Sequence, residues 1–382
     1  MRLVYNIAGL YRPSGMERVL TDKANWLAGH GYDVTIITTE QKGRPDAFPL
    51  DSSIKRRDLD IGYEDNNGGS LWDKIIHYPL KQLRHRNRLT KVLMEIKPDI
   101  TVSMFCNDQS FLPLIKDGSR KILELHFSRL KRLQYGRTGL WGFIDKVRSR
   151  NEIRQVKRFD RFVTLTKEDM SLWGDIPGIC SIPNGTRVPE ASSESHKGKT
   201  VIAVGRYVYQ KGLNRLIDAW KRVTEALGPD NGWQLLLVGD GDLRDELQEQ
   251  IDHLELNSSV VLCGTVEDMQ ALYRHASILA LSSHYEGLPM ALIEAQAYGV
   301  PAVCFDCKCG PKEVIIDGRT GLLVPEGDVE ALAGALLRLI RNPEERDRMG
   351  SEAARLADRF DINTIMTRWD KLFREDESPS TR

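Results

Sequence analysis

The sequence predicts an α/β protein with two doubly wound, Rossmann-like domains that face one another across a cleft. Short β-branched runs alternate with helical patterns in both halves of the 382-residue chain, which is the signature of parallel sheets covered by helices. A chain of this length can form two hydrophobic cores. The polar stretch 191–200 lies between the two halves and is typical of a linker.

Both halves show the same rhythm of strands and helices. The first contains strand-like runs at 2–8, Val34–Thr38, Ile100–Ser103, Lys121–Leu125 and Phe162–Leu165. The second contains them at Val201–Val204, Trp233–Val238, Val260–Cys263, Ile278–Leu281 and Ala302–Phe305. Apolar residues recur at helical spacing between them, as in Leu213–Leu227 and Leu243–Leu254. We expect domains at 1–190 and 191–359, then a helix at 360–377 and a disordered tail at 378–382.

Composition limits the class of protein. No apolar run reaches the roughly 18 residues of a membrane span, and the amino-terminal strand pattern is too brief for a signal peptide. Six cysteines in this length do not form a disulfide framework, so a reducing cytosol is expected. Lys and Arg outnumber Asp and Glu by 32 to 23 in residues 1–190, a charge of +9, and residues 191–382 carry −9. The basic half favours an acidic partner.

The most informative stretch is SHYEGLPMALIE, residues 283–294. Pro289 suits a first helical turn, which places Glu286 in the preceding loop and Glu294 about one and a half turns into the helix. The free amides of Gly287 and Leu288 and the positive end of the helix can bind phosphate, while the carboxylates can accept hydrogen bonds from sugar hydroxyls. The stretch indicates a nucleotide-sugar site. The alternative is an ordinary capped helix with a solvated glutamate.

Further candidate residues follow predicted strands. Arg206 and Lys211 lie after the first strand of the second domain, where a diphosphate would sit; they could instead be solvated surface cations. The loop Gly9–Gly15 lacks the dinucleotide spacing GxGxxG, but Gly15 would let its backbone amide approach a phosphate. His126 follows the strand Lys121–Leu125, and it could equally be a satisfied structural histidine.

Two other patterns invite a metal interpretation that we do not favour. Asp240-Gly-Asp242 could bind a divalent cation. Its spacing is more typical of a strand-to-helix turn in which Asp242 is the N-cap of the helix from Leu243. Cys304-Phe-Asp-Cys307-Lys-Cys309 contains a CxxC without a second pair of ligands in range. We interpret these cysteines as buried thiols at a strand end, and no metal is predicted.

Basic residues cluster in two helical stretches of the first domain. An aromatic segment, Leu140–Ile144 (LWGFI), interleaves with the second stretch. Cationic faces beside aromatics suit attachment to anionic lipid, although solvated helices are the alternative. Nucleic acid is not expected, because no recognised binding module accompanies the charge. The first basic stretch contains Lys74, Lys81, Arg84, Arg86, Arg88 and Lys91. The second contains Arg129, Lys131, Arg132, Arg137, Lys146, Arg148, Arg150, Arg154, Lys157 and Arg158.

Together these residues resemble the family-4 retaining glycosyltransferases, which have the two-domain GT-B fold. The resemblance covers most of the chain and is most specific in the Glu286-x7-Glu294 pattern with its upstream cations. It departs at Cys309-Gly310, where paired glycines are common. The remaining matches are Pro13-Ser-Gly15-Met-Glu17-Arg18, Asn184-Gly185, Val204-Gly-Arg206, Lys211-Gly212, Cys309-Gly-Pro311-Lys-Glu313-Val and Asp317-Gly318-x-x-Gly321-Leu-Leu-Val.

The resemblance implies a role for each candidate residue. Arg206 and Lys211 would neutralise the donor diphosphate, assisted by the amides of Gly15 and Leu288. Glu286 would contact the donor hexose and Glu294 the ribose. His126 would contact the 6-hydroxyl of the donor sugar or the acceptor, and Leu322 with Leu323 would line the nucleoside. The first domain would be the acceptor side and the last helix would cross back to it.

The implied activity is a retaining transfer of a hexose or N-acetylhexosamine from a nucleotide diphosphate sugar, expected to be UDP-linked, with no metal or other cofactor. The acceptor would be a glycan, expected to be polyprenyl-diphosphate-linked as for bacterial N-acetylgalactosamine transferases, and the enzyme would sit peripherally at the inner face of the cell membrane. The alternatives are a cytosolic transferase with a small soluble acceptor, a GT-B isomerase or phosphorylase, and a scaffold without activity.

Overall fold

The computed structural model describes residues 1–66, 71–129, 131, 139–189, 198–228 and 231–375. They form two compact units, Met1–Asn184 with Ile365–Arg382, and Gly185–Thr364. The boundary that we expected at 190 and the tail at 378–382 lie outside the described residues. The chain changes unit for the second time at Thr364, inside the last helix, where we had expected a boundary at 359.

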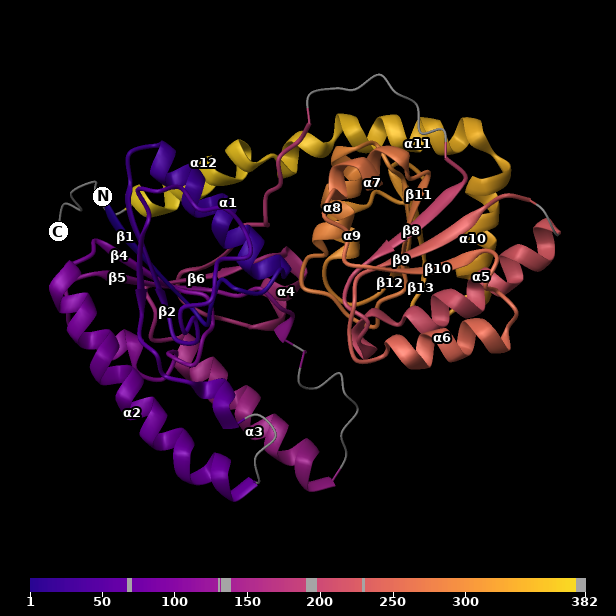
Figure 1. The fold of residues 1–382 in the computed structure, drawn as a ribbon. Coiled ribbons are helices and arrows are strands. Elements are labelled where there is room, and N and C mark those ends of the chain that lie inside the picture. Colours follow the sequence, from indigo (N-terminus) through magenta and orange to yellow (C-terminus); the bar gives the residue numbers. More distant parts are fainter. Residues whose placement is uncertain (67–70, 130, 132–138, 190–197, 229–230, 376–382) are drawn as a thin grey trace. The chain divides into compact units, whose positions relative to one another are not determined.

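A seven-stranded parallel sheet forms the centre of the first unit (Figure 1). Its order, β3-β2-β1-β4-β5-β6-β7, reverses direction between β1 and β4, so the sheet is doubly wound. The strands are β1 (Arg2–Ile7), β2 (Asp33–Thr38), β3 (Lys55–Asp58), β4 (Ile100–Ser103), β5 (Arg120–Glu124), β6 (Arg161–Thr164) and β7 (Ile179–Ser181). The α-helices are α1 (Gly15–Gly29), α2 (Leu71–Ile96), α3 (Gly139–Val156), α4 (Lys167–Leu172) and α12 (Ile362–Arg374).

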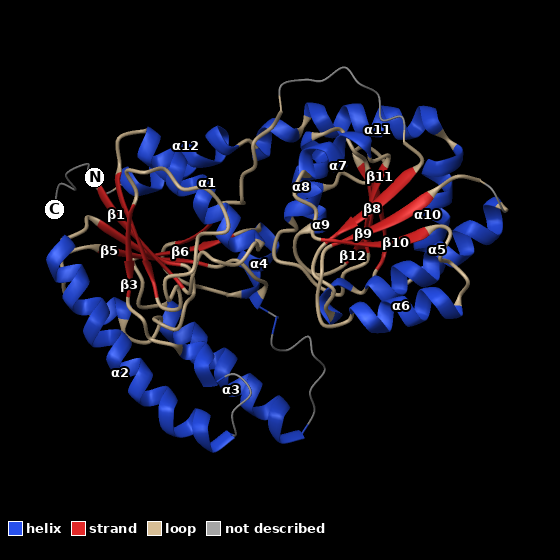
Figure 2. Ribbon diagram, viewed as in Figure 1, coloured by secondary structure: helices blue, strands red, loops and turns tan. Residues whose placement is uncertain are grey.

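The second unit repeats this architecture with six parallel strands in the order β10-β9-β8-β11-β12-β13. Figure 2 shows that helices lie on both sides of the strands in each unit. The strands are β8 (Thr200–Val204), β9 (Gln234–Val238), β10 (Val260–Gly264), β11 (Ile278–Leu281), β12 (Ala302–Asp306) and β13 (Gly321–Pro325). The α-helices are α5 (Leu213–Leu227), α6 (Arg244–His253), α7 (Met269–His275), α8 (Met290–Ala297), α9 (Pro311–Val314), α10 (Val329–Arg341) and α11 (Pro343–Arg355).

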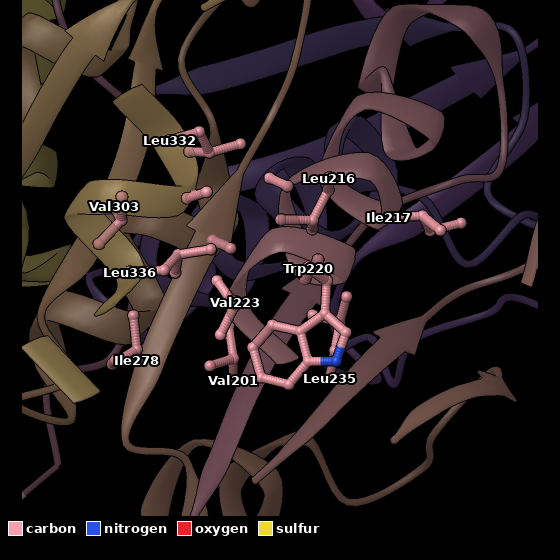
Figure 3. Close-up of a cluster of buried hydrophobic side chains, with 14 of the residues drawn as sticks. Val201, Leu216, Ile217, Trp220, Val223, Leu235, Ile278, Val303, Leu332 and Leu336 are labelled. Carbon is pink, nitrogen blue, oxygen red and sulfur yellow. The ribbon is translucent and has the colours of Figure 1, made fainter. Parts of the chain in front are cut away.

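The main core of the second unit lies between this sheet and helices α5, α6 and α10. Trp220 of α5 is fully buried at its centre, and Leu336 of α10 packs from the neighbouring helix (Figure 3). Both helices present apolar residues at three- and four-residue spacing to the sheet. Burial of this apolar face holds the strands in register, so the loops at their carboxyl ends have a rigid support.

The predicted fold class is confirmed, and the strands missed by the sequence analysis lie at sheet edges. The edge strands β3 and β7 close the first sheet, and β13 closes one side of the second. All four residues of β3 (KRRD) are exposed, so this strand has none of the apolar alternation that marks a half-buried strand. Edge strands tolerate such charged sequences because one side is open to water.

Three local predictions are corrected by the structure. Asp242 does not cap α6, because the turn continues through Leu243, which takes the N-cap position. Gly15 is the first residue of α1 rather than the last of the loop before it. Pro289 occupies the N-cap of α8, with extended backbone at φ −72° and ψ 109°, so the helix begins at Met290. Proline suits this position, because its ring fixes φ at about −65°.

The carboxyl-terminal helix α12 returns to the first unit. The Arg120 guanidinium donates hydrogen bonds of 2.8 Å to the carbonyls of Leu372 and Phe373, and the Tyr32 hydroxyl bonds Asp370. Trp369 is 1% exposed. The apolar side chains of α12 from Ile365 to Phe373 thus form one buried face in the first unit.

A buried histidine on α2 gives the first unit a pH-sensitive stability. His85 has no exposed surface; its Nδ1 lies 3.2 Å from the Tyr63 hydroxyl and its ring meets Phe111 edge-on at 5.0 Å. Burial lowers the pKa of His85 from 6.5 to about 4. The unfolded chain therefore binds this proton more tightly than the folded chain, and stability is lost as pH falls through this window.

We expect His85→Gln to flatten the dependence of stability on pH. Between about pH 6.5 and 4 the histidine should remove about 1.4 kcal/mol of unfolding free energy per pH unit, on the order of 3 kcal/mol in total. Urea unfolding of wild type and variant at several pH values across this window measures the difference. Parallel curves for the two proteins would contradict the assignment to His85.

Candidate active site

In doubly wound sheets, ligands bind beyond the carboxyl ends of the strands where the strand order reverses. In the second unit this point lies between β8 and β11. The loop 205–212 follows β8 and the loop 282–289 follows β11. Hydrogen bonds tie the two loops together, since the His284 amide donates to the Gln210 carbonyl at 2.9 Å and the Ser282 hydroxyl donates to the Lys211 carbonyl at 3.0 Å.

The two tied loops bring the predicted Lys211 and Glu286 into contact. The Lys211 Nζ lies 2.7 Å from Glu286 Oε1, and the Ser283 hydroxyl donates to the same oxygen at 2.6 Å. The side-chain nitrogen Nε2 of Gln210 lies 3.5 Å from the other carboxylate oxygen of Glu286, Oε2. Glu286 is only 4% exposed. A buried carboxylate requires such partners, and they fix its position at the switch point.

Two glycines allow this close approach. Gly212 adopts the left-handed conformation at φ 55°, and an added Cβ would lie 2.4 Å from the Ser282 carbonyl oxygen. At Gly205 an added Cβ would lie 2.9 Å from Cε of Lys211, so the lysine side chain runs directly over this glycine. The Gly205 and Lys211-Gly212 positions in the sequence motif therefore have a packing reason.

Arg206 differs from Lys211 in having an unengaged side chain. It is exposed, and its guanidinium makes no hydrogen bond or ion pair with any residue that the structure describes. Its backbone is fixed, because the Tyr207 amide next to it donates to the Asp240 carbonyl at 2.9 Å. The backbone of Arg206 is thus anchored at the carboxyl end of β8, and its guanidinium donors are available for an anion.

The start of α8 adds backbone donors to the same region. The amides of Gly287 and Leu288 donate no hydrogen bond to another residue within the described parts of the chain. The segment is held against Gly310, where an added Cβ would lie 2.7 Å from Cδ of Pro289. Gly310 itself has φ 97°, which disfavours other residues. Free amides at a helix start, in a loop tied to the one that carries Arg206 and Lys211, form a site suited to phosphate oxygens.

Glu294 lies on α8, and Leu322 lies on β13. The Glu294 Oε2 accepts a hydrogen bond of 2.7 Å from the hydroxyl of Tyr273, a contact that the sequence analysis did not foresee. Leu322 is 6% exposed and belongs to the hydrophobic core with α10. The structure therefore brings together Lys211 and Glu286 with the loops of Arg206 and Gly287–Leu288, whereas Leu322 packs in the core.

The two predicted site residues of the first unit, Gly15 and His126, lie on different elements of that unit. Gly15 opens α1 after the extended N-cap Ser14. The side chain of His126 is 5% exposed, and its Nε2 lies 3.2 Å from Glu124 Oε1. Glu124 also accepts hydrogen bonds of 2.7 and 2.6 Å from the buried Lys23. Burial alone would raise the pKa of Glu124, but Lys23 and His126 outweigh it and lower that pKa to about 2. His126 thus lies beside a buried, ionised carboxylate.

The aspartate and cysteine motifs that suggested metal sites are accounted for in other ways. Asp240 lies 3.8 Å from Arg244 across an exposed ion pair. Cys304, Cys307 and Cys309 are buried free thiols, as expected from the sequence, and burial raises the pKa of Cys307. Among the residues described, no group of three or more His, Cys, Asp or Glu side chains is arranged to hold a metal ion.

Residues 186–356 match the family described as glycosyl transferases group 1. The chain is 27% identical to the amylovoran biosynthesis glycosyltransferase AmsD of Erwinia amylovora, over 97% of this chain and 99% of that protein. It is 25% identical, over 98% and 99%, to a Campylobacter jejuni enzyme that adds α-1,4-N-acetyl-D-galactosamine to an undecaprenol-linked GalNAc–GalNAc–diNAcBac glycan.

A solved structure of a TarM variant from S. aureus has a TM-score of 0.78 at 16% sequence identity and covers 97% of this chain and 99% of its own; it contains UDP and α-GlcNAc-glycerol. The chain has the GT-B fold, and its residues 186–356 are similar to the glycosyl transferases group 1. The chain is a glycosyltransferase of polysaccharide or glycan biosynthesis.

Proposed function

We propose that this glycosyltransferase moves a hexose or N-acetylhexosamine from a UDP-sugar, with retention of anomeric configuration, to a glycan carried on a polyprenyl diphosphate. The observation that carries the proposal is the Lys211–Glu286 pair at the switch point, 2.7 Å apart, with the exposed Arg206 in the same loop as Lys211. Cations, free amides and a buried carboxylate in one place suit a diphosphate joined to a sugar.

In retaining transfer, the leaving diphosphate and the incoming hydroxyl meet the anomeric carbon on the same face. Negative charge develops on the diphosphate as the glycosidic bond breaks. Arg206, Lys211 and the amides of Gly287 and Leu288 stabilise that charge, and no metal is needed in this scheme. Glu286 accepts hydrogen bonds from hydroxyls of the donor sugar, and Glu294 from those of the ribose. The Gly15 amide and His126 complete the proposed donor contacts.

The relatives support the donor and acceptor classes. The Campylobacter jejuni relative acts on an undecaprenol-diphosphate-linked glycan, and the TarM structure contains UDP. AmsD belongs to the biosynthesis of a polysaccharide. By analogy we assign this chain a lipid-linked acceptor in the assembly of a cell-surface polysaccharide or glycoprotein glycan.

The first unit carries a basic surface suited to an anionic membrane. None of the helices formed by the described residues has the length and apolar character needed to cross a bilayer. On α2, however, exposed Leu80 (62%) and Leu83 (56%) accompany exposed basic residues, a combination that suits the membrane interface. Side chains of the LWGFI segment at Leu140, Trp141 and Phe143 lie outside the described residues. The exposed basic residues are Arg84, Arg86, Arg88 and Lys91, and Arg148, Arg150, Arg154, Lys157 and Arg158.

We place the enzyme peripherally at the cytoplasmic face of the cell membrane. Reversing Arg148, Arg150 and Arg154 to glutamate should weaken co-sedimentation with anionic vesicles at low salt, because each basic residue near such a surface contributes about 1 kcal/mol. Activity on a lipid-linked acceptor should fall, while activity on a short soluble acceptor should be spared.

A matched control replaces three exposed arginines of the second unit by glutamate, which reverses their charge: Arg341, Arg348 and Arg355. This variant should bind vesicles as wild type does. Equal losses in the two triple variants, or equal sedimentation with neutral and anionic vesicles, would remove the charge-based docking and favour a soluble acceptor.

The test of the proposed function is incubation with a panel of nucleotide sugars and a polyprenyl-diphosphate-linked oligosaccharide, in EDTA, followed by mass spectrometry. The expected result is one added sugar mass from a UDP donor. Strict dependence on Mg²⁺ or Mn²⁺ would restore a metal role for Asp240 and Asp242. Nucleotide-sugar conversion without transfer would favour an isomerase, and transfer only to a small soluble acceptor would favour the cytosolic alternative.

A further inference from the structure

A buried tyrosine hydroxyl binds the carboxylate that we assign to the ribose. Tyr273 lies on α7 and is 1% exposed, and its hydroxyl donates a 2.7 Å hydrogen bond to Glu294 Oε2 on α8. Its ring stacks on Tyr298, with centroids 5.6 Å apart and 17° between the planes. The ring is therefore held by packing, and the direction of the hydroxyl is set by that packing.

From this contact we infer that Tyr273 is a positioning residue for donor binding: it holds the Glu294 carboxylate in the orientation that accepts the ribose hydroxyls. The inference rests on the proposed function. A buried tyrosine hydroxyl needs an acceptor, and a backbone carbonyl would serve that need, as it does for Tyr207, which donates to the Leu237 carbonyl at 2.6 Å. Tyr273 instead donates to a half-buried carboxylate on the next helix of the site.

The contact fixes Glu294 without consuming its capacity to bind. A carboxylate has about four lone-pair sites, so Glu294 can hold the tyrosine and still accept from two vicinal hydroxyls. A hydrogen bond to an ionised acceptor is short and strong, and it restricts rotation of the glutamate side chain. A group that is already ordered loses less entropy when the ligand binds. Tyr273 therefore favours nucleotide binding, with no direct contact to the nucleotide.

The test compares Tyr273→Phe with wild type in calorimetric titrations with UDP and with 2′,3′-dideoxyuridine diphosphate, which lacks both ribose hydroxyls. Tyr273→Phe keeps the stacked ring and removes only the hydroxyl. We expect its affinity for UDP to fall about tenfold, because the Glu294 side chain is then no longer ordered in advance and must lose its rotamer freedom when the nucleotide binds. Its affinity for the dideoxy nucleotide should equal that of wild type, and kcat at saturating donor should be unchanged.

Tyr32→Phe is the matched control, because it also removes a hydroxyl bonded to a carboxylate, Asp370, but in the first unit. Both of its affinities should match those of wild type. Equal losses for UDP and the dideoxy nucleotide in Tyr273→Phe, or no loss for UDP, would overturn the positioning role. If wild type itself binds the two nucleotides equally, the ribose role of Glu294 in the proposed function fails instead. If it binds no nucleoside diphosphate, the donor site as a whole fails.

Discussion

Lys211→Ala is expected to lower turnover by about 10²–10³-fold, the loss typical of removing one preorganised group that stabilises developing charge. The lysine is held by Glu286 at 2.7 Å and by its passage over Gly205, so its charge is in place before the donor arrives. The loss should appear in kcat at saturating donor, measured by release of the nucleoside diphosphate.

Arg206→Ala should lower turnover to a similar extent but should differ in stability. Lys211→Ala leaves Glu286, 4% exposed, without its cation, which costs roughly 1–3 kcal/mol of unfolding free energy. Arg206 is exposed and engages no side chain that the structure describes, so its removal should leave the unfolding free energy within about 0.5 kcal/mol of wild type. Near-normal turnover in either variant would exclude that residue from the site.

Glu294→Ala should chiefly weaken nucleotide binding. Two hydrogen bonds from ribose hydroxyls to an ionised carboxylate would be lost, which corresponds to about 100-fold in the dissociation constant for UDP. The ribose contact is made equally in the ground state and in the transition state, so kcat at saturating donor should change little. Titration calorimetry and steady-state kinetics measure the two quantities separately.

The opposite division would contradict the ribose role: a fall in kcat at saturating donor with unchanged UDP affinity would place Glu294 at the reacting sugar. Tyr273→Phe should give a smaller loss of affinity than Glu294→Ala, because it leaves the carboxylate in place. A double variant should lose no more than Glu294→Ala alone, since the two residues act through one contact.

The alternation of strands and helices was sufficient to predict both sheets, because buried parallel strands are continuously apolar. The segment Leu213–Leu227 matches α5 at both ends, since its apolar face and its flanking glycines all indicate the same helix. The exposed strand β3 had no such signal. The start of α6 was misjudged because an aspartate before a helix is a common N-cap but not an obligatory one.

The site was predictable where a motif fixes residues of different strands at the carboxyl end of one sheet. Arg206, Lys211 and Glu286 follow β8 and β11, and the doubly wound order makes those strands neighbours. The side chains that hold the site were not predictable. Ser283 reaches Glu286 within their own loop, and Tyr273 of α7 reaches Glu294 of α8 through packing between elements. Neither residue type at its spacing predicts such a contact from the sequence.

The most direct test of the central claim is the anomeric configuration of the product formed from an α-configured UDP-sugar, determined by proton NMR of the purified glycan. If Lys211, Arg206 and the amides at the start of α8 stabilise a leaving diphosphate on the face that the acceptor attacks, the new linkage is α. It should form in EDTA with wild type and be nearly lost with Lys211→Ala. A β-linked product would contradict the account.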